Sequence, residues 1–157
     1  VGDLKYGRTV HSLVKALTHF GAKLYFVAPE TLQMPKYILE DLDSLGIEYT
    51  LLNDYREIMG EIDVFYMTRI QRERFPDDEE YEKVKDVYIL NKEDVVGKAK
   101  EEMIILHPLP RVNEIAVNLD DTKHALYFKQ AANGVPVRQA LLSLSLGYKA
   151  KLQEGDK

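Results

Sequence analysis

The chain has 157 residues, of which 45% are hydrophobic and 30% charged, which is the composition of an ordinary globular domain. Its formal charge of −5 is the opposite of the balance typical of nucleic-acid-binding domains, so that class is disfavoured. It has no cysteine, which excludes disulfide scaffolds, thiol nucleophiles and cysteine-ligated metal sites. No apolar run approaches the roughly 20 residues that span a bilayer, and the first residues do not resemble a signal peptide. We therefore expect no membrane association and a cytoplasmic location.

The first residues are interpreted as the end of a strand followed by a helix. Val1-Gly2-Asp3 has the form of a strand's last residues. Thr9 is expected to cap the helix, and Gly21 to end it. Residues 24–27 are nearly all apolar, which is typical of a buried strand. The apolar helix positions recur at the spacing of one helical face: Val10, Leu13, Val14, Leu17 and Phe20.

Helices and strands continue to alternate through the middle of the chain. Pro35 suits the first turn of a second helix, which Gly46 is expected to end. Strands are expected over 48–52 and 63–67, with a short helix over 55–59 between them. The apolar positions of the second helix are Ile38, Leu39, Leu42 and Leu45.

The last third of the chain ends in a long helical region. A strand over 88–90, a helix over 92–100 and a strand over 103–106 precede it. The final helical region, 127–146, is expected to be interrupted near Gly134 and Pro136.

This alternation predicts an α/β fold, a three-layer doubly wound (Rossmann-like) domain with a mainly parallel sheet. We expect the domain to span residues 1–147, followed by a polar, flexible tail over 148–157. Ligands in such folds bind beyond the carboxyl ends of the strands, so the segments that follow the strands hold the candidate site residues.

Arg8 and Thr9 lie at the expected start of the first helix. Free backbone N–H groups and the helix dipole favour an anion there, and Arg8 adds a planar, bidentate donor. The alternative is a solvated arginine in a first turn, where the dipole disfavours a positive charge. That awkward placement favours a binding role for Arg8.

Arg69 and Gln71 follow the strand over 63–67 directly. Residues two apart in an extended segment point to the same side, so both can reach one ligand. Most charges over 69–86 are better explained as a solvated surface loop, and an isolated Arg-X-Gln is weak evidence.

The third segment is His107-Pro108-Leu109-Pro110. Two prolines remove two backbone donors and leave carbonyls free to accept hydrogen bonds. The turn could include a cis X–Pro bond, or it could simply terminate the strand. His107 by itself is more commonly a hydrogen-bonded core histidine than a functional one.

Together these segments resemble the aspartate-binding half of the aspartate carbamoyltransferase family. The similarity runs from residue 1 to about 147, in family order and spacing. Ornithine carbamoyltransferases share the fold but typically have a cysteine where Pro108 stands, and a different first signature. A nucleotide-binding Rossmann domain is disfavoured because no Gly-X-Gly-X-X-Gly follows a strand. The matching motifs are Gly7-Arg-Thr-Val-His-Ser12, Tyr66-Met-Thr-Arg-Ile-Gln71 and His107-Pro-Leu-Pro-Arg-Val-Asn-Glu-Ile115.

The resemblance implies transfer of the carbamoyl group from carbamoyl phosphate to the amino group of L-aspartate, which gives N-carbamoyl-L-aspartate and phosphate in pyrimidine biosynthesis. It calls for no metal and no organic cofactor. It implies that Arg8 and Arg69 bind aspartate, with Gln71 assisting and Thr9 in support. The Pro108 and Leu109 carbonyls would hold the carbamoyl amine, Leu109 and Pro110 would border the carbamoyl phosphate site, and Leu109–Pro110 would be cis. Arg74, Glu80 and Tyr81 would order the charged loop on domain closure, with Glu80 pairing to Lys5 or Tyr6.

The family's carbamoyl-phosphate-binding domain, with its Ser-Thr-Arg-Thr phosphate cradle, has no counterpart in these 157 residues. In the family that domain is a partner within each chain, and a neighbouring subunit of a homotrimer completes each site. We therefore expect the isolated chain to be inactive, and its last helix to expose apolar residues that pack on the first domain. A non-catalytic dicarboxylate-binding or assembly module is the alternative.

Overall fold

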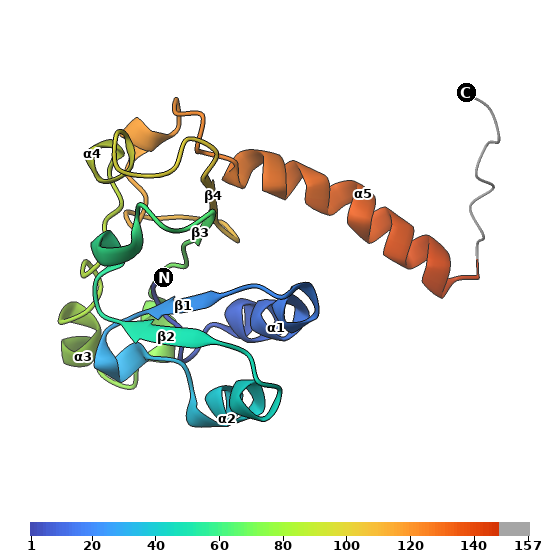
Figure 1. Cartoon of the computed structure of the whole chain (residues 1–157), viewed down its shortest axis with the longest axis horizontal. Coiled ribbons are helices and arrows are strands. Elements are labelled where there is room, and N and C mark those ends of the chain that lie inside the picture. Colours follow the sequence, from blue (N-terminus) through green and yellow to red (C-terminus); the bar gives the residue numbers. More distant parts are fainter. Residues whose placement is uncertain (148–157) are drawn as a thin grey trace.

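A computed structural model describes residues 1–147 of the chain, and the expected tail over 148–157 lies outside the described residues. Its strands form two parallel pairs (Figure 1), β1 (Leu24–Val27) with β2 (Tyr49–Leu52) and β3 (Val64–Tyr66) with β4 (Ile104–Leu106). Leu24 lies opposite Tyr49, and Val64 opposite Ile104. Helices connect these strands, which confirms the expected Rossmann-like α/β architecture.

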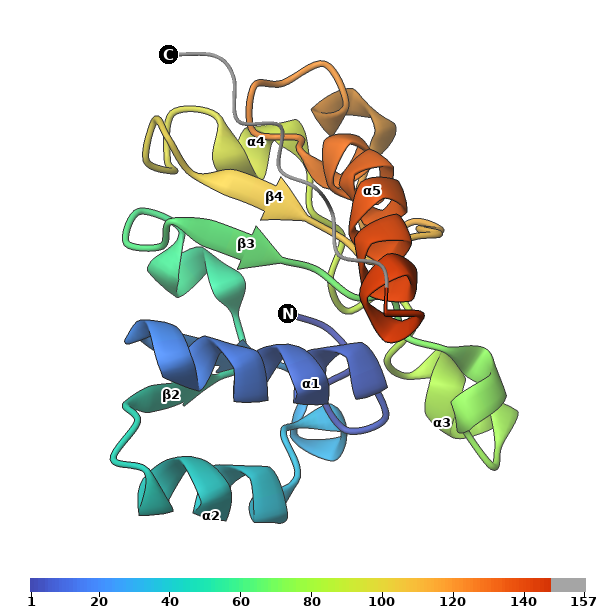
Figure 2. The same cartoon turned by 90° about the vertical axis from the view of Figure 1, so that its right-hand side faces the viewer.

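Residues Val1 and Gly2 join the two strand pairs. The Val1 N–H donates to the Tyr66 carbonyl at 2.8 Å, and the Val1 carbonyl accepts from the Thr68 N–H at 2.9 Å. On the other side, the Gly2 N–H donates to the Val27 carbonyl at 3.0 Å. These bonds place residues 1 and 2 between β1 and β3, as expected for the end of a strand, although the structure assigns no strand to residues 1–3. Figure 2 shows this end of the chain between the two pairs.

The first strand pair carries its own core. Val10 and Val14 of α1 (Arg8–Leu17) and Ile38 and Leu42 of α2 (Lys36–Ser44) pack in one buried cluster with residues of β1. Short 3-10 turns accompany these elements at Thr18–Phe20 and Glu30–Leu32, and a third at Tyr55–Ile58 packs in the cluster around β3 and β4. Of the apolar positions predicted for the two helices, those within the observed helices supply the buried side chains.

A second buried cluster surrounds β3 and β4. Phe65 and Ile105 belong to the strands, and Met67 follows β3 directly. Tyr55 joins the cluster from the 3-10 turn after β2, and Tyr127 joins it from the last helix. Around it lie α3 (Asp78–Glu82), α4 (Lys92–Val95), α5 (Tyr127–Ser145) and 3-10 turns at Arg72–Arg74 and Val117–Leu119. None of the helices in residues 1–147 is both long and apolar enough to cross a membrane.

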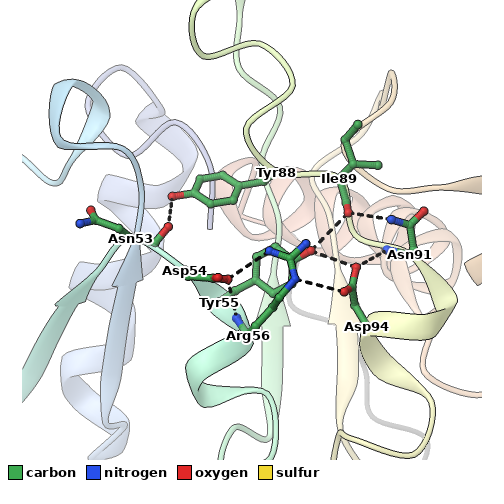
Figure 3. A network of polar contacts seen from close by, with 8 residues as sticks. All are labelled: Asn53, Asp54, Tyr55, Arg56, Tyr88, Ile89, Asn91 and Asp94. Carbon is green, nitrogen blue, oxygen red and sulfur yellow. Dashed lines mark hydrogen bonds and ion pairs between the residues drawn. The ribbon is translucent and has the colours of Figure 1, made fainter.

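A polar network around Tyr55 fastens this second cluster (Figure 3). The hydroxyl of the fully buried Tyr55 lies 3.2 Å from the Ile89 carbonyl oxygen and 3.1 Å from Asp94 Oδ2, and its single proton is shared between these two acceptors. Asp94 also accepts from the Asn91 backbone N–H and from Arg56 Nε. Burial, followed by the Asp94 charge, raises the pKa of Tyr55, so the hydroxyl stays a donor. The network ties the 3-10 turn that contains Tyr55 to the start of α4.

Several expected boundaries in the first half are wrong. Gly7 rather than Thr9 precedes the first helical residue, because the Gly7 carbonyl accepts from the N–H groups of Val10 and His11. Phe20, the last position of the expected helical face, is 79% exposed because α1 ends before it in a 3-10 turn. Leu45 is likewise exposed beyond the end of α2.

Boundaries in the second half differ as well. The expected strand over 88–90 is a single bridge from Leu90 to Ile115. The helix expected over 92–100 ends at Val95, because Gly97 turns the chain with a φ of +78°. The helix α3 was not expected, because its sequence is almost entirely acidic and has no apolar face.

The interruption expected in the last helix is also wrong, since α5 is continuous through Gly134 and Pro136. The Arg138 guanidinium lies over Gly134, where a Cβ would come within 2.5 Å of it. A proline removes one N–H from the helical ladder, and the remaining bonds carry the helix past it. As expected, α5 exposes apolar side chains, and Figure 1 shows it extending away from the strands. They are Phe128, Val135, Val137, Leu141, Leu142, Leu144 and, just after the helix, Leu146.

Candidate functional site

Three segments that follow strand positions converge on one cavity of about 190 Å³. The first is the loop from Asp3 into α1, the second follows β3, and the third follows β4. Arg8 and Arg69, far apart in the sequence, both line this cavity. The full lining is Asp3, Tyr6, Gly7, Arg8, Thr9, Thr68, Arg69, Gln71, Arg74, His107, Pro108, Leu109 and Pro110.

The loop before α1 presents Arg8 and Thr9 as the first two residues of that helix. Gly7 allows the close approach of this loop, because a Cβ there would lie 2.5 Å from the Asp3 carbonyl oxygen. The first turn has no acidic residue. The unpaired N–H groups of the helix start and the Arg8 guanidinium therefore favour an anion on this side of the cavity.

The second segment supplies two more arginines. Arg69 is half-buried and donates to Glu73 Oε1 at 2.9 Å, and Arg74 Nε donates to Gln71 Oε1 at 3.1 Å. Each cavity-facing guanidinium of this segment is thus restrained by a neighbour. With Arg8, three guanidinium groups line the cavity against the single carboxylate of Asp3. The charge balance favours a ligand with more than one negative charge.

The third segment is the turn after β4, where the peptide bond between Leu109 and Pro110 is cis, as expected. Leu109 has a φ of +53°, a conformation that side chains rarely adopt. The Leu109 N–H donates to Nδ1 of the buried His107 at 2.8 Å. His107 Nε2 lies 2.7 Å from Oε1 of Glu114, which is also buried. Burial would raise the pKa of Glu114, but hydrogen bonds from His107 and from backbone N–H groups outweigh it and lower the pKa.

Asp3 is a cavity residue that the sequence analysis missed. It is only 2% exposed, and its Oδ1 accepts from the Tyr6 N–H at 2.9 Å. Its Oδ2 has no hydrogen-bond partner among residues 1–147. Burial, the largest effect, raises the pKa of Asp3 above its usual value. The sequence analysis also missed Tyr6 and Thr68. Their positions close to Arg8 and Arg69 in the sequence, where strands end, could have indicated that they line the same cavity.

The residues expected to support loop closure lie outside the cavity lining, except Arg74. Lys5 Nζ stands over the Tyr6 ring at 5.0 Å. Tyr6 contacts Phe75 edge-on, and Phe75 contacts Tyr81 in the same way. Within residues 1–147, no hydrogen bond or ion pair joins Glu80 to Lys5 or Tyr6. An aromatic contact, rather than an ion pair, connects the charged loop to the loop before α1.

The described part of the chain contains no group of three or more His, Cys, Asp or Glu residues placed to hold a metal ion. What the cavity offers is guanidinium donors, helix N–H groups and the carbonyls of a proline turn. This set can bind a carboxylate or phosphate on one side and an N–H donor on the other.

Comparison with known families agrees with this geometry. Residues 1–145 match the family model described as aspartate/ornithine carbamoyltransferase, Asp/Orn binding domain. The chain belongs to this family. The aspartate carbamoyltransferase catalytic subunit of Brachyspira hyodysenteriae is 56% identical over 145 residues, which are 92% of this chain and 40% of that protein. The subunit of the same name from Thermococcus kodakarensis is 54% identical over 147 residues, 94% of this chain and 47% of that protein.

Solved structures of this carbamoyltransferase family have the same fold. The catalytic subunit of M. jannaschii aspartate transcarbamoylase has a TM-score of 0.82 at 53% identity, covering 90% of this chain and 46% of that one. Aspartate transcarbamoylase from Trypanosoma cruzi, solved in complex with aspartate and phosphate, has a TM-score of 0.77 at 38% identity, with 90% and 44% covered. The chain thus spans less than half the length of these relatives.

Proposed function

We propose that this chain is the L-aspartate-binding half of an aspartate carbamoyltransferase. The observation that carries the proposal is that Arg8 and Arg69, from separate strand ends, line one cavity with the cis-proline turn. L-Aspartate has two carboxylates, and each guanidinium can grip one through parallel N–H···O bonds. Gln71, half-buried in the same wall, adds an amide, and Thr9 flanks Arg8.

In the proposed reaction the amino nitrogen of aspartate forms a bond to the carbamoyl carbon. The bond from that carbon to the phosphate oxygen breaks, and phosphate leaves with the electron pair and takes up the proton that the attacking nitrogen gives up. The carbonyls of Pro108 and Leu109 accept hydrogen bonds from the carbamoyl amine, and Leu109 and Pro110 border the donor. The main contribution of this half is to hold the amine next to the carbonyl, which raises its effective concentration.

The chain by itself holds only part of the machinery. A carbamoyl-phosphate-binding domain is proposed as its partner, covering the exposed apolar side chains of α5, in a cytoplasmic homotrimer that serves pyrimidine biosynthesis. The exposed face of α5 also favours the second candidate, an assembly module without catalysis. In that case the chain would self-associate or bind a partner through α5 and would not bind dicarboxylates.

Calorimetry with L-aspartate and succinate distinguishes the two. The first proposal expects binding that falls about 10- to 100-fold in Arg69→Ala, the loss of a charge-assisted bidentate contact. Arg72→Ala is the matched control, because Arg72 pairs with Asp78 outside the cavity and its loss should leave binding unchanged. L-Ornithine should bind more weakly than L-aspartate.

Activity gives the second test. The chain alone should show no carbamoylation of aspartate, and adding a carbamoyl-phosphate-binding domain from a close relative should restore it. The proposal would be refuted if wild type and Arg69→Ala gave equal heats with L-aspartate and the mixture of the two domains had no activity. The assembly module would then be the better explanation.

A further inference from the structure

The buried imidazole of His107 makes two hydrogen bonds whose directions fix its protonation. Its Nδ1 lies 2.8 Å from the backbone nitrogen of Leu109, which can only donate, so Nδ1 carries no proton. Its Nε2 lies 2.7 Å from Glu114 Oε1. A neutral ring then has its proton on Nε2 and donates it to the Glu114 carboxylate.

Both ends of this arrangement are restrained. The second oxygen of Glu114, Oε2, accepts from the Val112 N–H at 3.0 Å. The backbone N–H of His107 donates to Oε1 of Gln130, a residue of α5, at 2.9 Å. His107 and Glu114 are 1% and 5% exposed, so water does not compete for these bonds. The imidazole is therefore held in one orientation.

That orientation determines where the Pro108 carbonyl points. The peptide between Pro108 and Leu109 is trans and planar, so its C=O and N–H point in opposite directions. Because the Leu109 N–H points to the buried imidazole, the Pro108 carbonyl points away from it. Pro108 and Leu109 both line the cavity, which is where an oxygen directed away from the buried ring can meet a ligand. The bond also holds Leu109 at a φ that a leucine would otherwise avoid.

We propose that His107 is a positioning residue that, as the neutral Nε2–H tautomer, aims the Pro108 carbonyl at an N–H group of the carbamoyl donor. The proposal rests on the proposed function, and it adds a source of donor specificity. A carbonyl oxygen in this place favours a carbamoyl group, which has an NH₂, over an acetyl group, which has a methyl in the same position. Donor choice thus depends on a histidine whose side chain is fully buried behind the proline turn.

The first test needs no turnover and no variant. ¹⁵N-edited NMR of the histidine rings at neutral pH should show His107 protonated at Nε2 and unprotonated at Nδ1. The Leu109 amide should exchange slowly with solvent. A proton on Nδ1, or a fast-exchanging Leu109 amide, would overturn the proposal whether or not the chain takes part in catalysis.

The second test separates the two hydrogen bonds of the ring. His107→Asn places an amide oxygen near the position of Nδ1 and can still accept from Leu109, whereas His107→Gln reaches Glu114 and loses that acceptor. In enzyme completed with a carbamoyl-phosphate-binding domain, His107→Gln should raise the KM for carbamoyl phosphate about fivefold to tenfold, the loss of one hydrogen bond. His107→Gln should also reduce the ratio of activity with carbamoyl phosphate to activity with acetyl phosphate. In His107→Asn, the KM for carbamoyl phosphate and this activity ratio should stay within about twofold of the wild-type values.

An equal rise in the KM for carbamoyl phosphate in the two variants would overturn the positioning role. An unchanged donor preference in His107→Gln would overturn it as well. If one variant does not fold, the NMR measurement of the His107 tautomer and the Leu109 amide in the wild-type chain decides whether the proposal stands. If the completed wild-type enzyme has no activity, the proposed function fails, and the tautomer and the Leu109 amide still decide whether the carbonyl is positioned as argued.

Discussion

Replacing Asp3 with asparagine should stabilise the chain at neutral pH. The Asp3 carboxylate is 2% exposed, one oxygen accepts a single backbone hydrogen bond, and the other has no partner within residues 1–147. An unsatisfied buried polar group costs about 1–3 kcal/mol, and a charged one more. The asparagine carbonyl can keep the bond from Tyr6 while the charge is removed. We therefore expect Asp3→Asn to raise the free energy of unfolding by about 1–2 kcal/mol.

The stability difference between Asp3→Asn and the wild type should increase with pH. Burial raises the pKa of Asp3 in the folded chain above its ordinary value of 3.8. As the pH rises past that value, the unfolded chain ionises first, so the wild type loses stability until the pH exceeds the folded-state pKa. Asp3→Asn lacks this loss, so the two proteins should converge at low pH and separate as the pH rises.

Urea denaturation followed by circular dichroism from pH 4 to pH 8 measures the difference. At neutral pH it corresponds to a rise in the melting temperature of about 3–6 °C for a chain of this size. A variant that is equally or less stable than the wild type at every pH would show that the buried charge is compensated, and would refute the reasoning.

Three further substitutions test the fold. Gly2→Ala should lower the free energy of unfolding by at least about 2 kcal/mol, because its Cβ would lie 2.3 Å from the Thr68 carbonyl oxygen at a φ of +114°. Gly97→Ala, also at positive φ but in open space, should cost only about 1 kcal/mol, and equal losses in chemical denaturation would contradict the steric argument. Tyr55→Phe should cost about 1–2 kcal/mol in the same assay, because the hydroxyl that bridges to Asp94 is lost while the ring keeps its packing. No change in the unfolding midpoint would mean that the network in Figure 3 does not contribute to stability.

Much of the fold follows from local patterns in the sequence. Short apolar runs such as 24–27 form parallel strands, and the central apolar positions of the first helices reach the core. The errors come from interactions between elements. Gly7 displaces Thr9 at the start of α1 because its carbonyl takes two N–H groups, and α5 continues past Pro136 because one missing bond does not end a long helix.

The site residues that the sequence predicts share one property, a position just after a strand. Arg8, Arg69 and the proline turn stand at strand ends, and the structure brings them to one cavity. Asp3 could not be assigned in the same way, because its importance comes from burial, and a sequence does not show which oxygen lacks a partner. The contact of Tyr81 with Phe75 depends on a loop conformation that the run of acidic residues does not specify.

The backbone bonds of Val1 and Gly2 have a consequence for ligand size. Arg8 is carried by the half of the molecule built on β1, and Arg69 follows β3 in the other half. The thickness of one extended backbone therefore separates the supports of the two guanidinium groups. A four-carbon diacid and a five-carbon one differ by a single methylene in the chain between their carboxylates. Under the proposed function, a preference for one diacid over the other depends on the spacing that the sheet gives to the supports of Arg8 and Arg69.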